Sequence, residues 1–175
     1  MQPKFFTLPP YTLPWKYIIV NPKTYKLGIR YLKRHSGSIE EIIIDTGVEI
    51  FRNGMKDYPG GYKIHFKRLL TIRREMRRVA KDIPIWVVAP DYPSDYPGNI
   101  IEDNVDKTLK ALNWVRNNFS TEYIIAVFQS KPIWLDPDLG FFLLNLGRYV
   151  DEGIFRDFKY IGLGTVCTIS QLRLK

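Results

Sequence analysis

The feature that most limits how this chain can fold is the alternation of short apolar runs with longer amphipathic stretches. The apolar runs predict strands at Tyr17–Val20, Glu41–Ile44, Ile85–Ala89, Tyr123–Phe128 and Tyr160–Leu163. Their residues are apolar almost without interruption, which is typical of parallel strands that are covered on both faces.

Amphipathic helices are predicted between these strands, over residues 24–35, 62–82, 102–118 and 138–150. In the second helix, Leu69, Ile72, Met76 and Val79 recur at spacings of 3, 4 and 3 and form one apolar stripe. Gly28 is a weak point in the first helix, because glycine is a poor helix former.

Strands that alternate with helices predict a parallel α/β fold. Two architectures fit this order, a doubly wound sheet and a (β/α)8 TIM barrel. A complete barrel takes about 250 residues, whereas this chain has 175. We therefore expect a single domain over residues 1–175, which as a barrel would be incomplete, with about five strands.

Composition and charge exclude several classes of protein. The N-terminal stretch contains four prolines and no signal-peptide pattern, and no apolar run approaches the roughly 18 residues of a membrane helix. The single cysteine, Cys167, excludes an internal disulfide, and with only His35 and His65 beside it the chain cannot build a zinc site. We predict a cytoplasmic protein with no membrane partner, no cofactor and no metal.

Polar residues and glycines occupy the C-terminal ends of the predicted strands. They are, in chain order, Asn21, Asp45, Asp91, Gln129, Gly162 and Gly164. Each alone can be a turn former or a packing residue. Because parallel strands end at one edge of the sheet, the set is expected to converge there, where α/β proteins bind ligands. Amide and carboxylate groups beside glycines suit a planar, polar ligand such as a nucleobase.

Aromatic and basic residues add two weaker signals. Phe51, Tyr92, Tyr96 and Phe128 lie on or near the loops after these strands, and any one of their rings could stack on a base. The net charge is +8, and residues 63–81 contain eight Lys or Arg against one acid, Glu75. This stretch either binds nucleic-acid phosphates, with Lys67, Arg74, Arg77 and Arg78 as the candidates, or is a solvated helix face.

Four segments in order, "IIIDTGVEIF", "VVAPDYPSD", "IAVFQS" and "YIGLGTVC", resemble the tRNA-guanine transglycosylase superfamily. The likeness is closest to the branch of phages and archaeal viruses that places 7-deazaguanine bases in DNA. It runs from about Ile42 to Thr168 and covers roughly the first two thirds of that family's barrel. The segment "NVDKTLKALNWV" fits as the helix after the third strand.

The resemblance implies a TIM barrel that exchanges guanine for a 7-deazaguanine in DNA or tRNA through a covalent sugar–aspartate intermediate. It implies that Asp45 is catalytic and moves a proton to or from the base. Asp91, Gln129, Gly162 and Gly164 would bind the base, with Phe51 as the stacking candidate. The partners would be nucleic acid and a purine or 7-deazapurine base.

The chain also departs from the family pattern. Val48 and Ser130 stand where the family has glycines. The family's nucleophilic aspartate and its zinc cluster would come after Lys175. We therefore expect the N-terminal part of a barrel, which acts as a partial or split enzyme completed by a second chain or another copy.

Three alternatives stay open. The chain could be a non-catalytic module that binds a base or nucleic acid, or an unrelated α/β enzyme that holds Mg²⁺ through Asp45 and Asp91. Cys167 could be a nucleophile, although no histidine lies in a loop that would obviously bring it close.

Overall fold

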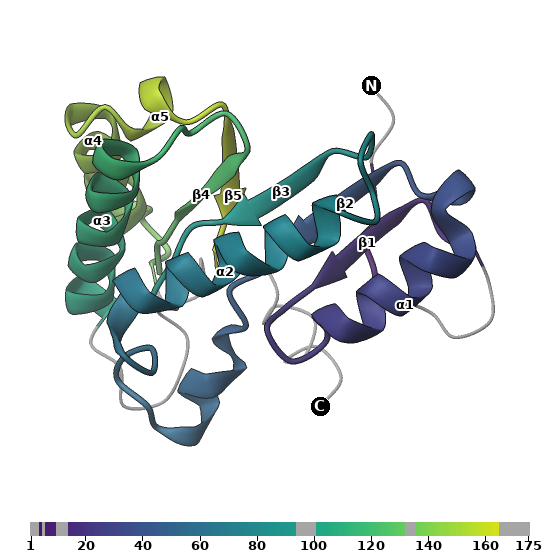
Figure 1. The fold of residues 1–175 in the computed structure, drawn as a ribbon. Coiled ribbons are helices and arrows are strands. Elements are labelled where there is room, and N and C mark those ends of the chain that lie inside the picture. The colour runs from purple at the N-terminus through teal and green to yellow at the C-terminus, as the bar shows by residue number, and fades with distance from the viewer. Residues whose placement is uncertain (1–3, 5, 10–13, 94–100, 132–135, 165–175) are drawn as a thin grey trace.

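The computed structural model describes residues 4, 6–9, 14–93, 101–131 and 136–164 (Figure 1). The strands are β1 (Tyr17–Val20), β2 (Glu41–Ile44), β3 (Ile85–Val88), β4 (Ile124–Phe128) and β5 (Tyr160–Leu163). The helices are α1 (Tyr25–His35), α2 (Gly61–Arg77), α3 (Ile101–Asn118), α4 (Gly140–Asp151) and α5 (Ile154–Asp157), with 3-10 turns η1 (Ser36–Ser38) and η2 (Val48–Asn53).

The predicted strands and helices are confirmed, with small differences at their ends. The second helix stops at Arg77 instead of residue 82, and the backbone N–H groups of Arg78 and Val79 close its last turn. The sequence did not predict η1, η2 or α5, which are too short for a hydrophobic period to develop.

All five strands pair in parallel, and their order in the sheet is the order in the chain, β1-β2-β3-β4-β5. Ile19 pairs with Ile43, Ile43 with Trp86, and Ile125 with Tyr160. The expected parallel α/β fold is therefore confirmed. In Figure 1, α1 and α2 cross in front of the sheet, while α3 and α4 stand beside β4.

The core lies between one face of the sheet and the helices. Ile18, Val20, Ile42 and Ile44 point into it and belong to the same buried cluster as Leu69 and Met76 of α2. On the opposite face, Ile19, Ile43, Trp86 and Ile125 are only half-buried. The expectation that both faces would be covered alike is thus wrong for β1 and β2, where burial alternates along the strand.

The β5 edge of the sheet displays apolar side chains to solvent. Leu163 of β5 is 65% exposed, and Leu143 and Leu144 of the neighbouring helix α4 are 58% and 63% exposed. None of the helices in the described part of the chain is long and apolar enough to cross a membrane.

Close packing requires a glycine at position 28 of α1, although glycine is a poor helix former. A Cβ atom at this position would come within 2.6 Å of Val20 Cγ1 and 3.4 Å of Met76 Cε. Glycine therefore lets α1 lie close against β1 and α2. This close packing stabilises the fold by more than the higher helix propensity of alanine would.

We expect Gly28→Ala to lower the free energy of unfolding by about 1–3 kcal/mol, because overpacking must displace the buried Val20 side chain. Gly147→Ala in α4 is the matched control, since nothing lies within 4 Å of its added Cβ atom. There alanine should stabilise the protein by up to about 1 kcal/mol. Urea denaturation of both variants measures the difference, and equal effects would contradict the close approach of α1.

Candidate functional site

Three of the predicted strand-tip residues meet at the C-terminal edge of the sheet. Asp91, three residues after β3, is 6% exposed and accepts hydrogen bonds on both carboxylate oxygens. Gln129 Nε2, directly after β4, donates to Oδ2 over 2.7 Å, and Thr46 Oγ1, just past β2, donates to Oδ1 over 3.1 Å. The third residue, Asp45, lies close enough for its charge to act on Asp91. The convergence expected from parallel strands thus occurs for these three residues.

A stacked ring pair, Tyr58 just before α2 and His65 within it, supports this edge. Tyr58 donates its hydroxyl to the Asp91 carbonyl over 2.6 Å, and the Asp91 N–H donates back to that hydroxyl over 3.3 Å. His65 stacks on the Tyr58 ring, with centroids 4.1 Å apart, and its Nε2 donates to the Thr46 carbonyl over 2.9 Å. A carbonyl can only accept, so His65 carries its proton on Nε2.

Burial and a neighbouring carboxylate set the protonation of Asp91. Removal from water and the charge of Asp45 raise its pKa from 3.8 to about 7, against the hydrogen bonds from Thr46 and Gln129, which lower it. Burial also lowers the pKa of His65 to about 4, with a further contribution from Arg68. The site therefore combines a carboxyl group that titrates near neutrality with an imidazole that stays neutral there.

The backbone of Gln129 is fixed by a hydrogen bond to Tyr149, while its side-chain Oε1 has no donor among the described residues. Tyr149 of α4 donates to the Val127 carbonyl over 3.0 Å and accepts from the Gln129 N–H over 3.3 Å. Gln129 Oε1 is buried, and no described residue donates to it. A Cβ atom added to Gly164 would lie 2.4 Å from this oxygen, so the backbone there closely approaches the amide. This arrangement explains the glycine at position 164.

The other predicted site residues lie farther from this contact. Gly162 faces Ile125 and Val127 of β4 rather than Gln129. Phe51 is 4% exposed and packs edge-on against Tyr58, with centroids 5.1 Å apart. Its expected role in stacking on a base stays a prediction, and the structure gives it a packing role.

Two of the remaining aromatic candidates are also packed. Tyr92 is 2% exposed and donates its hydroxyl to Asp57, while Phe128 is 3% exposed and contacts Tyr149. Tyr96 and Cys167 lie outside the described residues.

Asn21 and Asp45 both accept backbone hydrogen bonds that stabilise the turns after their strands. Asn21 Oδ1 accepts from the N–H groups of Lys23 and Thr24 over 2.9 and 3.1 Å, which orders the loop into α1. Asp45 Oδ2 likewise accepts from the Gly47 N–H over 3.1 Å. Gly47 has φ of 74°, a left-handed conformation that favours glycine. Asp45 thus forms a turn and also lies beside Asp91.

The basic candidates Lys67, Arg74, Arg77 and Arg78 are all exposed on or just after α2. They extend along the helix away from the strand tips. The Arg77 guanidinium donates to the Lys81 carbonyl over 3.1 Å. Their contact with phosphates stays a prediction.

Sequence reasoning overlooked Thr46, Tyr58 and His65 as parts of the site. Thr46 stood in the quoted "IIIDTG" segment and was a detectable signal, because a hydroxyl next to a strand-tip acid can reach the neighbouring tip. The positions of Tyr58 and His65 depend on how α2 docks, which no local pattern encodes. Across the described residues, no group of three or more His, Cys, Asp or Glu side chains is arranged to hold a metal ion.

The fold and this edge define an α/β protein with a buried acid–amide pair at the C-terminal ends of parallel strands. The chain matches no protein-family model, no curated protein and no solved structure.

The raised pKa of Asp91 predicts a specific dependence of stability on pH. The folded protein keeps this proton up to about pH 7, whereas the unfolded chain releases it near 3.8. The folded state binds more protons in between, so this group's contribution to stability is full below pH 3.8 and is lost as pH rises through 7. Relative to Asp91→Asn, the wild type should lose about 4 kcal/mol of unfolding free energy over this range.

Urea denaturation across this pH range measures the difference between the two proteins. Asp103→Asn, on the exposed surface of α3, controls for the loss of one carboxyl group. Parallel stability curves for wild type and Asp91→Asn would show that Asp91 ionises normally.

Proposed function

We propose that this chain binds a purine or 7-deazapurine base at the tips of its strands. The proposed reaction is base exchange on nucleic acid, of the tRNA-guanine transglycosylase type. The observation that carries the proposal is the buried pair Asp91 and Gln129, in which the amide Oε1 has no donor among the described residues. A buried acceptor without a donor is unfavourable, so a ligand that supplies an N–H group there gains free energy.

The chemistry of the pair favours guanine and its 7-deaza analogues. Asp91 and Gln129 Oε1 place acceptors side by side, and guanine presents two kinds of N–H donor along one edge, on ring N1 and on the exocyclic N2. Adenine has an acceptor at ring N1, which would face these oxygens without a proton. The site is therefore proposed to select guanine-type bases by their donors.

The order of the strands supports a barrel-like scaffold. A doubly wound sheet reverses its strand order at a switch point, whereas the five described strands follow one another without reversal. A TIM barrel has this sequential order, with the binding site at the C-terminal ends of its strands. We infer that the sheet is an arc of such a barrel, consistent with the four segments that resemble the transglycosylase superfamily.

Asp45 is proposed to be the acid–base group of the exchange. Departure of a purine breaks the bond between base nitrogen and sugar carbon, and the leaving nitrogen needs a proton. Asp45 is only partly buried and lies beside Asp91, whose pKa of about 7 allows the carboxyl pair to hold a proton near neutrality. Exchange also needs a nucleophile that attacks the sugar carbon, and we assign that role to none of the described residues.

Leu163 of β5 and Leu143 and Leu144 of α4 are exposed and are the proposed contacts for a second chain. Incorporation of labelled guanine into DNA or tRNA separates the catalytic role from base binding alone. Exchange that occurs only when a partner chain is added would support a split enzyme.

Calorimetric titration with guanine, 7-cyano-7-deazaguanine and adenine tests the base site. We expect the first two to bind without added metal and adenine to bind at least about tenfold more weakly, since a buried unpaired acceptor costs roughly 1–3 kcal/mol. Asp91→Asn should remove binding, and Asp103→Asn should retain it. No binding of any base to the folded protein overturns the proposal, and Mg²⁺ binding that is lost in Asp91→Asn would favour a metal-dependent enzyme.

Gly162 in β5 and Gly164 directly after it give a matched test of the Gln129 amide. Gly164→Ala places a methyl group 2.4 Å from Gln129 Oε1 and must displace it, whereas at Gly162 the nearest atom is Ile125 Cγ2 at 3.4 Å. We therefore expect Gly164→Ala to weaken guanine binding at least about tenfold through the lost hydrogen bond. Gly162→Ala should bind within about twofold of wild type. Equal affinities in the two variants would argue that Gln129 does not contact the base.

A further inference from the structure

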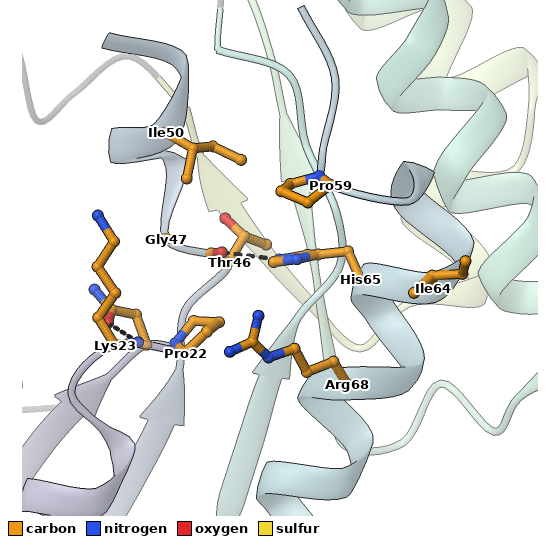
Figure 2. Close-up of a pocket in the computed structure, with 10 residues that line it drawn as sticks. Pro22, Lys23, Thr46, Gly47, Ile50, Pro59, Ile64, His65 and Arg68 are labelled. Carbon is orange, nitrogen blue, oxygen red and sulfur yellow. Dashed lines mark hydrogen bonds between the residues drawn. The ribbon is translucent and has the colours of Figure 1, made fainter. Parts of the chain in front are cut away.

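A concave site lies at the same edge of the sheet, beyond Thr46. It is a cavity of about 180 Å³ between the loop after β1, the segment after β2 and the first two turns of α2 (Figure 2). The proposed base site does not use this cavity, and its walls come from three parts of the chain that the fold brings together.

The cavity carries positive charge on two walls. Lys23 comes from the loop after β1 and Arg68 from α2, and both side chains are exposed. Figure 2 shows the Arg68 guanidinium reaching across toward Pro22. Neither cation forms an ion pair within the described part of the chain, and none of the lining residues is acidic. This charge pattern suits an anion rather than a metal ion.

The rest of the wall is largely apolar, which suits an anionic group that is part of a larger, partly apolar molecule. Pro22, Ile50, Pro59 and Ile64 line the cavity, and Ile64 is 61% exposed. A small inorganic anion would leave these apolar surfaces in water. A sugar–phosphate unit would place its charge beside Arg68, within reach of the long, exposed Lys23 side chain, and its carbon atoms against the prolines and isoleucines.

A single residue joins this cavity to the strand-tip acid. Thr46 donates its hydroxyl to Asp91 and accepts the His65 N–H on its carbonyl, and both Thr46 and His65 line the cavity. A ligand in the cavity is therefore next to any ligand that contacts Asp91.

We propose that Lys23 and Arg68 bind a backbone phosphate of the nucleic acid, next to the nucleotide whose base the strand tips hold. The assignment of the polymer rests on the proposed function, whereas the anion site itself rests on the cavity and its two cations. Arg68 then differs in role from the other basic residues of α2. Arg78 lies ten residues farther along, roughly 15 Å down the helix axis and away from the strand tips.

The test compares two double variants that remove the same charge. Lys23→Gln with Arg68→Gln removes the proposed phosphate ligands, and Lys33→Gln with Arg34→Gln removes one exposed lysine and one exposed arginine from the last turn of α1. Fluorescence anisotropy of a labelled single-stranded oligonucleotide measures affinity over a range of salt concentrations. All four positions are exposed, so we expect both variants to fold, with unchanged thermal midpoints as the check.

We expect the first pair to weaken binding at least about tenfold, because hydrogen bonds to a charged group are among the stronger ones. It should also reduce the slope of log K against log salt by about 0.7, which corresponds to one phosphate of a single strand. The second pair should change affinity by less than about twofold, which sets the scale for loss of non-specific charge. Equal losses in the two pairs, or a loss only in the second, would overturn the proposal.

Two further measurements identify the ligand and separate this proposal from the base site. Three unlabelled competitors are compared: inorganic phosphate, a mononucleotide and an oligonucleotide. At equal total concentration of phosphate groups, we expect the oligonucleotide to displace the labelled strand far more effectively than the other two. Competition by the mononucleotide at the same concentration would overturn the polymer assignment in favour of a free nucleotide. Free guanine should still bind to the Lys23→Gln, Arg68→Gln variant, so failure of the base site would appear as lost guanine binding in the wild type.

Discussion

Parallel pairing of consecutive strands is the constraint on which the rest of this structure depends. Each strand must be followed by a connection that returns to the opposite end of the sheet, and here a helix takes that path between each pair of neighbours. All strands therefore end at one edge. Residues separated by more than eighty positions in the chain, such as Asp45 and Gln129, become neighbours of Asp91 for this reason alone.

The buried carboxyl group of Asp91 shows how that edge is stabilised. Two side-chain donors, Thr46 and Gln129, oppose the desolvation of the carboxylate, while the Tyr58 hydroxyl binds its backbone. Removal from water and the nearby Asp45 still dominate, so the group titrates near neutrality. A group poised in this way is typical of functional sites. The same network continues through Thr46 to His65, which links the acid to the cavity between Lys23 and Arg68.

The parts of the site that sequence reasoning found share a simple origin. Asp91 and Gln129 were predictable because each follows an apolar run, and the ends of parallel strands must meet. Phe51 was chosen because it is an aromatic residue in a nearby loop, but the ring packs against Tyr58 and Tyr92. Local sequence cannot distinguish an aromatic ring that is available to stack on a ligand from one that packs against its neighbours. The same limit applies to α2, where Arg68 reaches the cavity and Arg78 does not.

The sequence by itself determined the order and type of the strands and of helices α1 to α4, because burial of apolar side chains imposes periods that can be read along the chain. It also determined which polar groups stand at the strand ends. Only the tertiary structure decided which of these groups touch, since contact depends on strand register and on the docking of α2 against β2 and β3. Gly28 shows the difference well: its propensity marks a weak helix position, and the 2.6 Å approach to Val20 makes the same glycine necessary.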